Sequence, residues 1–197
     1  MTQKRDIEFL FELGTLRFVE RKWSQFLNAG VANVAEHTLR VAWLSFLIAK
    51  YESGADLGRI FKLALIHDMT ESRTGDTNPV TRQYNIQDDK KAVKDIFTDT
   101  FLQEEAESLF KEYKERKSIE AKIVKDADNL DVDLEIIERD TMGIKHPKVW
   151  YKYRDVAGAN LYTKTARQLY KKIKTSDPHD WHINAPNRFE DVKKWMK

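Results

Sequence analysis

The chain has 197 residues, of which 41% are hydrophobic and 34% charged, with a formal net charge of +2 and no cysteine. This length suits a single domain with one sizeable core. Acids and bases nearly balance, which predicts a solvated, salt-bridged surface and argues against a stable nucleic-acid partner. The lack of cysteine excludes disulfides and thiolate chemistry, and fits a reducing compartment such as the cytoplasm.

Two segments, one internal and one at the N-terminus, were considered as possible membrane-spanning or secretory sequences. The longest uncharged apolar run, "VAWLSFLIA", is too short to span a bilayer. The first residues, "MTQKRDIEFL", lack the apolar segment that a secretory signal carries behind its basic residues. We therefore expect no membrane partner.

Helical periodicity dominates the chain, and no strand pattern is convincing. We expect helices over residues 6–22, 35–50 and 57–72, one long or two shorter helices over 87–117, and further helices over 118–140 and 159–174. Turn residues interrupt the pattern in "RTGDTNPVT". An irregular aromatic connection is expected in "MGIKHPKVWYKYRD", and a loop in "DPHDWHINAPNRF" before a short last helix. The pattern predicts an all-α, single-domain helical bundle over residues 1–197.

Two His-Asp pairs are candidates for metal binding, although such dipeptides are common by chance. The first pair lies in "LALIHDMTES", where His67 shares one helical stripe with Ile60, Ala64 and Glu71. A buried Glu71 needs a cation or a metal-bound water as a partner. The alternative is a hydrogen-bonded core histidine, with Glu71 capping its own turn.

The second pair, His179 and Asp180, lies between Pro178 and Trp181 in a turn-rich segment. No apolar helical face surrounds it. We interpret it as a feature of a surface loop.

His37 and Asp128 strengthen the case for the first pair. His37 shares the inward face of its helix with hydrophobic residues, namely Val41, Leu44 and Ile48. Asp128 lies on the flank of the apolar stripe of its helix, one turn from both Val124 and Val132. The competing acids on that helix, Asp126 and Asp131, are expected to be exposed to solvent.

These residues form a plausible buried set of two imidazoles and two carboxylates: His37, His67, Asp68 and Asp128. Such a set suits transition metals better than calcium, so we expect one divalent metal, which is Mn, Co, Ni, Fe, Mg or Zn. A metal there would lower the pKa of a bound water, and Glu71 could orient or deprotonate that water.

This order of ligands resembles the HD-domain metal-dependent phosphohydrolases, and most closely the 5'-deoxynucleotidases of the YfbR type. Three stretches carry the resemblance: "NVAEHTLRVAWLS", "LALIHDMTESRTGD" and "EAKIVKDADNLD". It extends over about residues 21–135, and the sequence after about residue 140 matches less well. The resemblance implies an HD-type helical bundle, a homodimer, and release of the 5'-phosphate from (deoxy)nucleoside monophosphates.

The resemblance also implies roles for individual residues. Those in the metal set become the ligands, and Glu71 and Asp76 become the catalytic carboxylates, with Asp76 also close to the sugar. Trp23 stands where the family has a tryptophan beside the sugar, and Lys22 stands where it has a phosphate-binding arginine. Lys22 can neutralise a phosphate but lacks the planar fork of arginine, so either Lys22 or the adjacent Arg21 is expected to offset the charge on the phosphate. The complete substrate-binding set is Arg21, Lys22, Trp23, Asp76, Thr77 and Pro79.

Other branches of the superfamily fit the sequence less well. No Gly-Tyr-Pro signature is present, and no histidine occurs between His67 and Asp128, which favours one metal over two. The alarmone hydrolases have Glu-Asp where this chain has Glu71 and Ser72. Two alternatives stay open: a hydrolase of polyphosphorylated nucleotides (an alarmone or a nucleoside triphosphate), and a metal-stapled module that binds a nucleotide or a partner without turnover.

Overall fold

The computed structural model describes residues 4–27, 30–144, 146 and 148–184. As predicted, the protein is all-α: within these ranges, the only strand-like pairing is an isolated antiparallel bridge between Glu20 and Asn33. The elements are α1 (Lys4–Gly14), η1 (Thr15–Phe18), α2 (Ser24–Leu27), α3 (Val34–Ala49), α4 (Leu57–Ile66), α5 (Glu71–Thr74), η2 (Thr81–Gln83), α6 (Asp89–Phe97), α7 (Gln103–Glu115), α8 (Ile119–Thr141), α9 (Lys148–Ala159), α10 (Lys164–Ile173) and α11 (Asp180–Ile183).

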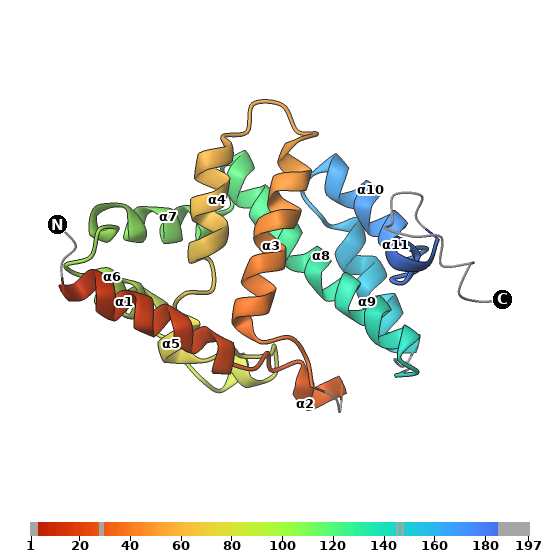
Figure 1. Ribbon diagram of the computed structural model, residues 1–197, viewed down its shortest axis with the longest axis horizontal. Coiled ribbons are helices and arrows are strands. Elements are labelled where there is room, and N and C mark those ends of the chain that lie inside the picture. Colours follow the sequence, from red (N-terminus) through yellow and green to blue (C-terminus); the bar gives the residue numbers. More distant parts are fainter. Residues whose placement is uncertain (1–3, 28–29, 145, 147, 185–197) are drawn as a thin grey trace.

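The long helix α8 is the centre of the bundle. It packs against α3, α4, α7, α9 and α10, and Figure 1 shows it running behind α3 and α4. Its apolar stripe is buried, with Ile123, Ala127 and Leu130 fully shielded from solvent. Because helices surround α8 on several sides, polar residues away from the apolar stripe are also buried. The candidate site is formed by such buried polar residues of α8 and of the helices packed against it.

The first and third predicted helices end earlier than expected. The helix predicted over 6–22 ends at Gly14, and the chain continues through η1 to Val19, whose carbonyl accepts the backbone N–H of Val34 at 2.9 Å. The helix predicted over 57–72 stops at Ile66, and α5 begins only at Glu71.

In the part of the chain that the structure describes, none of the helices combines the length and the apolar character that a membrane span requires.

The segment over 87–117 forms two helices, which was one of the two predicted arrangements. α6 and α7 are separated at Asp99, which has a positive φ of 59°. A residue in this left-handed region cannot continue a helix.

The prediction of an irregular connection was wrong for residues 148–155, which belong to α9. α9 is held to the core by Arg154, whose guanidinium makes two 2.7 Å hydrogen bonds to the buried carboxylate of Asp133. The next helix, α10, begins at Lys164 and not at residue 159, because Thr163 caps its N-terminus. The expected loop after it contains the short α11, and the predicted last helix lies outside the described residues.

Candidate metal-dependent active site

Four side chains converge at the centre of the bundle, from α3, from the end of α4 and from the middle of α8. The Nε2 atom of His37 lies 3.4 Å from Asp68 Oδ2 and 3.3 Å from Asp128 Oδ1. The Nε2 atom of His67 lies 3.3 Å from that of His37 and 3.1 Å from Asp68 Oδ2. Both imidazoles are buried. The structure therefore brings together all four residues of the predicted metal set.

The spacing of these donor atoms fits a metal. Ligand atoms about 2.1 Å from a cation lie roughly 3.0–3.4 Å from their neighbours in octahedral or tetrahedral geometry, and His37 Nε2 lies at such distances from a donor atom of each of the other three residues. The outer nitrogens are also engaged: Nδ1 of His37 pairs with Asp131 Oδ2 at 2.6 Å, and Nδ1 of His67 with the Ala64 carbonyl at 2.7 Å. A proton on each Nδ1 leaves each Nε2 lone pair for the metal.

The early end of α4 explains how adjacent residues both reach the site. Consecutive side chains on an α-helix point about 100° apart, so His67 and Asp68 leave the backbone in different directions. After Ile66 the backbone tightens, with i→i−3 hydrogen bonds from Met69 to Ile66 and from Glu71 to Asp68. This turn aims both ligands inward and returns Glu71 to the same side.

Asp131 and Asp126 were predicted to be exposed, and both predictions were wrong, because α8 is covered on several sides and each carboxylate is fully buried. Asp131 accepts from His37 and also pairs with Arg40, so it fixes the orientation of a candidate metal ligand. Asp126 accepts the backbone N–H groups of Tyr162 and Thr163 at 2.8 and 2.7 Å. Its role is to hold the loop that precedes α10.

Asp128 has two partners that the sequence reasoning missed. The buried Tyr113 hydroxyl donates to Asp128 Oδ2 at 3.2 Å, and Lys125 Nζ lies 2.7 Å from the same oxygen. The Tyr113 and His67 rings also make a T-shaped contact, with 5.5 Å between ring centroids. Lys125 precedes Asp128 by three residues on one helix, a spacing that brings side chains together and was a readable signal. Tyr113 comes from α7 and had no such signal.

The carboxylates around His37 set the charge of the metal-free site. Burial opposes a positive charge on the imidazole, but hydrogen bonds to Asp128, Asp131 and Asp68 outweigh it and hold the pKa of His37 well above its ordinary value. Burial, followed by the negative charges of Asp68 and Asp76, raises the pKa of Glu71 to about 10. At neutral pH the metal-free site therefore holds protons on both His37 and Glu71.

Metal binding should release these protons. A divalent cation cannot bind Nε2 of a protonated His37, and its charge beside Asp68 lowers the pKa of Glu71. We expect calorimetric titration of metal-free protein with Mn²⁺ or Co²⁺ near pH 7 to show release of one to two protons, read from buffers of different ionisation enthalpy. Affinity should rise with pH until both groups are deprotonated. An affinity independent of pH from 6 to 8 would contradict this account.

Asp68 and Asp128 of the metal set line a polar cavity of about 250 Å³. Arg21, Trp23, Asp76, Thr77 and Pro79 line it together with Glu71, so five of the six predicted substrate residues gather around the site. The lining also contains residues that were not predicted, among them Arg82, Lys114, Arg116, Asn129 and Tyr153.

Lys22 is the exception among the predicted substrate residues. Its side chain is exposed and does not contribute to the cavity lining, while its backbone N–H donates to Asp76 Oδ2 at 2.6 Å. Arg21 is buried in its place, and its Nε has no hydrogen-bond partner among the described residues. Burial opposes the positive charge of Arg21, but the carboxylates of Asp128 and Asp68 outweigh this effect and raise its pKa. The structure thus puts Arg21, and not Lys22, above the metal set.

The second His-Asp pair lies apart from this site. His179 and Asp180 are exposed at the start of α11, and His179 Nδ1 lies 3.0 Å from Nε2 of His182. Within the described residues, the cluster with metal-binding geometry contains His37, His67 and Asp128, and neither residue of this pair.

Comparison with known proteins agrees with this geometry. The HD domain model matches residues 13–173. The chain belongs to the HD-domain family. Similar relatives named 5'-deoxynucleotidase occur in Dictyostelium discoideum (31% identity over 67% of this chain and 76% of the relative), Pectobacterium atrosepticum (30%, 68% and 74%) and Homo sapiens (28%, 77% and 76%).

Solved structures of other proteins share the fold of this HD-domain protein. A conserved hypothetical protein from Pyrococcus furiosus superposes with a TM-score of 0.70 at 24% identity, covering 86% of this chain and 99% of that one. A predicted metal-dependent phosphohydrolase from Magnetospirillum magnetotacticum gives 0.67 at 22% identity, covering 87% and 90%. The family match extends beyond residue 140, where the sequence resemblance weakened, and includes α9 and α10.

Proposed function

We propose that this chain is a metal-dependent phosphohydrolase that removes the 5'-phosphate of (deoxy)nucleoside monophosphates. The observation that carries the proposal is the cavity in which Arg21 and Glu71 face the four-residue metal set. The names of the relatives from three distant organisms support the same substrate class. The lack of cysteine fits our inference that the enzyme works in the cytoplasm.

Each side chain has a definite task in this reaction. His37, His67, Asp68 and Asp128 would hold the metal, which when bound polarises the phosphate and acidifies a water. Glu71 accepts the proton of the attacking water and Arg21 offsets the charge that develops on the phosphate oxygens. Asp76, fixed by the Lys22 backbone N–H, presents its carboxylate to the sugar. Trp23 packs beside the sugar.

The test is a screen of nucleoside mono-, di- and triphosphates with Mn, Co, Ni, Fe, Mg and Zn. Phosphate and pyrophosphate are measured separately. We expect release of phosphate from monophosphates. Release of pyrophosphate or triphosphate would favour a hydrolase of polyphosphorylated nucleotides, and a bound metal without any release would favour a non-catalytic binding module.

The positions of Arg21 and Lys22 predict different effects of substitution. Arg21→Ala should lower kcat/KM for deoxynucleoside monophosphates by roughly 10²–10³-fold, the range for removal of one preorganised charge-stabilising donor. Lys22→Ala should lower it by only a few-fold, because the backbone contact to Asp76 survives. Arg21→Lys should recover part of the activity. Equal losses for both alanine variants would return the phosphate role to Lys22.

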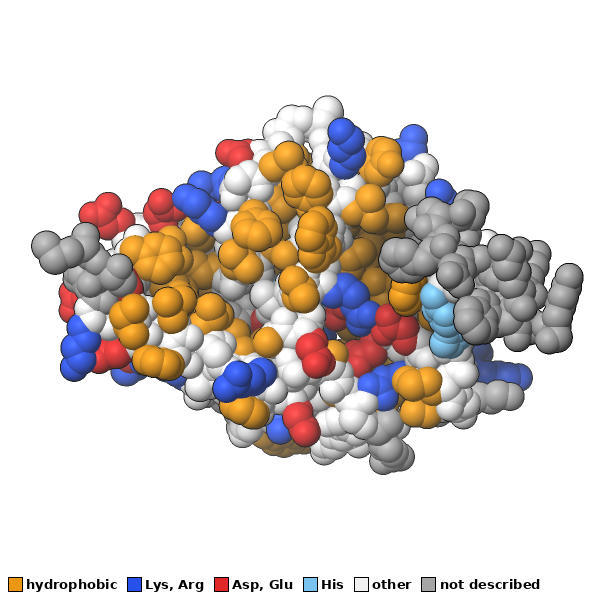
Figure 2. Space-filling model, in the orientation of Figure 1, with side chains coloured by type: hydrophobic (Ala, Val, Ile, Leu, Met, Phe, Trp, Pro, Cys, Tyr) orange, Lys and Arg blue, Asp and Glu red, His pale blue; other side chains and the backbone are white. Residues whose placement is uncertain are grey.

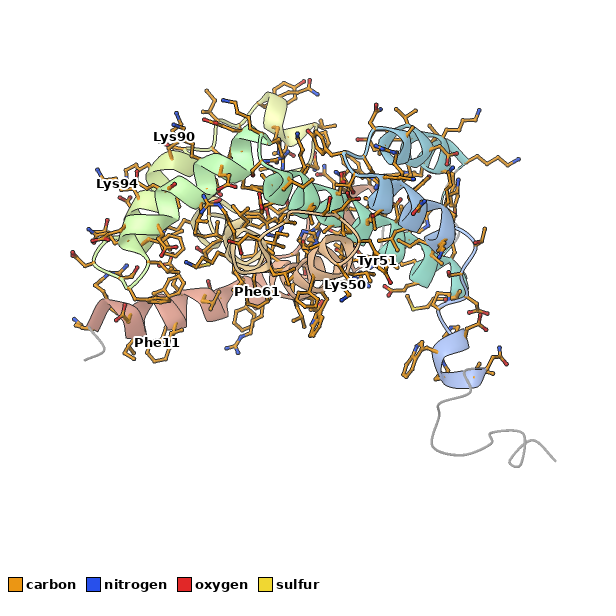
Figure 3. The ribbon with its side chains drawn as sticks, turned by 90° about the horizontal axis from the view of Figure 1, so that it is seen from above. Phe11, Lys50, Tyr51, Phe61, Lys90 and Lys94 are labelled. Carbon is orange, nitrogen blue, oxygen red and sulfur yellow. The ribbon has the colours of Figure 1, made fainter. Side chains whose placement is uncertain are left out.

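We also infer that the enzyme is a homodimer. Hydrophobic side chains gather over α1, α3 and α4 on one side of the molecule (Figure 2), and Phe11 and Phe61 project from this side, opposite Lys90 and Lys94 (Figure 3). Six aromatic residues here expose between 46% and 76% of their surface, roughly 750 Å² in total if each ring offers about 200 Å². A standard interface buries about 800 Å² per partner. We call this surface the apolar face: Ile7, Leu10, Phe11, Phe18, Leu39, Trp43, Phe46, Leu47, Tyr51, Leu57, Phe61 and Leu65.

A single charge should separate the dimer. Trp43, near the middle of α3, is 68% exposed, so Trp43→Glu should leave the monomer folded while placing a carboxylate in the interface. We expect light scattering at micromolar concentration to give the dimer mass for the wild type and the monomer mass for this variant. Trp181→Glu is the matched control, because Trp181 is 75% exposed on α11 and should not alter the mass. A monomeric wild type would refute the inference.

A further inference from the structure

Helix α1 runs along α6 and α5 and is tied to both (Figure 1). In its first turn, the guanidinium of Arg5 donates to the backbone carbonyls of Ile96 and Thr98 at 2.8 and 3.2 Å, which fixes the helix to the C-terminal end of α6. In its last turn, the carboxylate of Glu12 contacts α5 instead. The second contact is the one that bears on the candidate site, because α5 begins with Glu71.

Glu12 holds the two residues that follow Glu71 in the chain. Arg73 donates from Nε to Glu12 Oε1 at 2.6 Å and from Nη2 to Oε2 at 2.8 Å, and the Ser72 hydroxyl donates to Oε1 at 3.1 Å. Only 19% of the Glu12 side chain is exposed, and the hydrogen bond from Arg73 holds the pKa of Glu12 below its ordinary value. We call these three residues, Glu12, Ser72 and Arg73, the α1 clamp.

The α1 clamp differs from an ordinary surface ion pair, which usually contributes little. Its Arg73 bonds are bidentate, and two parallel bonds fix direction as well as distance. They also join residues 61 positions apart in the sequence, on two different helices. The clamp therefore constrains where α5 lies relative to α1, whereas a pair within one helix would constrain only that helix.

The turn that carries Glu71 has little support of its own. α5 spans only Glu71–Thr74, and none of these residues is buried. A helix of this length is not stable by itself. The Gln87 side chain holds its far end by donating to the carbonyls of Thr74 and Gly75 at 3.0 and 2.8 Å. The α1 clamp acts on the two residues directly after Glu71, so it is the nearer of these two supports.

Glu71 and the α1 clamp lie on different sides of the same turn. Glu71 lines the metal cavity, while Ser72 and Arg73 face α1. Side chains two residues apart on a helix point about 200° apart, so Arg73 is held from the side away from the cavity. A misplacement of about 1 Å in a reacting group can cost about 100-fold in rate. The attachment of this turn is therefore relevant to catalysis.

From this geometry we propose that Glu12 is a positioning residue for the reaction: through Ser72 and Arg73 it fixes the turn that places Glu71 in the metal cavity. Glu12 is not among the residues that line the cavity, so its effect is exerted through Glu71. The proposal rests on the proposed function, since it concerns the same base.

Replacing Glu12 by alanine should lower kcat while leaving binding intact. We expect Glu12→Ala to reduce kcat for deoxyadenosine monophosphate by about 10- to 100-fold, the size of effect that a misplaced group produces. KM and metal content should change by less than about threefold, because the cavity lining and the metal set are untouched. Glu12→Gln keeps an acceptor for Arg73 without the charge, and should fall between the wild type and Glu12→Ala. A wild-type kcat in Glu12→Ala would overturn the proposal.

A double-mutant cycle tests whether Glu12 acts through Glu71. In a Glu71→Gln background the base is already absent, so adding Glu12→Ala should change kcat by less than about threefold. A purely structural role would not depend on Glu71. Glu12→Ala would then lower kcat by the same factor in both backgrounds, and that result would overturn the proposal.

Arg5→Ala is the matched control, because it removes the other attachment of α1 and leaves the α1 clamp in place. It should lower the unfolding temperature, as Glu12→Ala does, but keep kcat within about twofold of the wild type. An equal fall in kcat for the two variants would show that any loosening of α1 is sufficient, and would overturn the specific role of Glu12.

Hydrogen exchange tests the α1 clamp without turnover. The backbone N–H groups of Arg73 and Thr74 donate to the Thr70 carbonyl, and that of Gly75 donates to the Glu71 carbonyl. These amides should exchange faster in Glu12→Ala but not in Arg5→Ala. Unchanged exchange in Glu12→Ala would overturn the proposal. Failure of the proposed function is seen separately, as no phosphate release from any nucleotide by the wild type, and exchange then decides the clamp alone.

Discussion

Replacing His67 by alanine should remove the metal and the activity together. His67 supplies one of four convergent donors, and its Nε2 lies 3.1–3.3 Å from two of the others. Losing a direct ligand should weaken metal binding more than the ~10–100-fold that follows loss of an outer contact. We expect less than stoichiometric metal after dialysis, measured by atomic emission, and a fall in kcat of more than about 100-fold. Thermal unfolding of the metal-free variant checks that the chain still folds.

His179→Ala is the matched control for this experiment. His179 belongs to the other His-Asp pair, is exposed, and contacts His182 instead of the metal set. Metal content and turnover should equal those of the wild type. Full metal content in His67→Ala, or loss of metal in His179→Ala, would show that the wrong pair was assigned.

Glu71→Gln should separate catalysis from metal binding. The substitution keeps the size of the side chain and removes its ability to accept a proton. We expect kcat to fall by roughly 10²–10⁴-fold, the usual contribution of a positioned acid or base, while metal content stays at the wild-type level. Single-turnover phosphate release with saturating deoxyadenosine monophosphate measures the step directly.

Glu104→Gln serves as the control for the loss of a carboxylate, since Glu104 is exposed in the first turn of α7 and away from the cavity. It should not change kcat. If Glu71→Gln retains kcat within a few-fold, the metal alone activates the water. If it loses metal, Glu71 is a ligand and the four-residue set is incomplete.

The convergence of His37 and His67 could be predicted because helical periodicity indicates which residues face inward. His37 shares a stripe with Val41 and Ile48, both fully buried in the structure, so its burial could be inferred from its neighbours. The same reasoning placed His67 inward even though α4 ends at Ile66. The turn that brings Asp68 to the same centre has no periodic pattern. Asp68 was instead predicted from the His-Asp motif that it forms with His67.

Other features depend on tertiary packing and could not be read from one helix at a time. Asp131 appeared exposed because it lies off the apolar stripe of α8, but α3 covers that side and supplies His37 and Arg40 as partners. α9 was missed because this stretch was interpreted as an irregular aromatic connection, although Trp150 and Tyr153 stand three residues apart. Arg154 stabilises that helix through Asp133, a contact across the bundle that the sequence does not reveal.

The three carboxylates around His37 have a consequence for how the metal is exchanged. When no metal is bound, the protonated imidazole is the counter-ion of Asp68, Asp128 and Asp131. Because the pKa of His37 is raised, this pairing stabilises the fold fully below its unfolded-state value and is lost only as pH rises through the raised value. Asp68 and Asp128, whose pKa values lie well below the usual range despite their burial, stay ionised at about pH 5. Mild acid should therefore release the metal without unfolding the chain. The ion that binds when the pH returns to neutral will depend on which divalent ions are present and at what concentration.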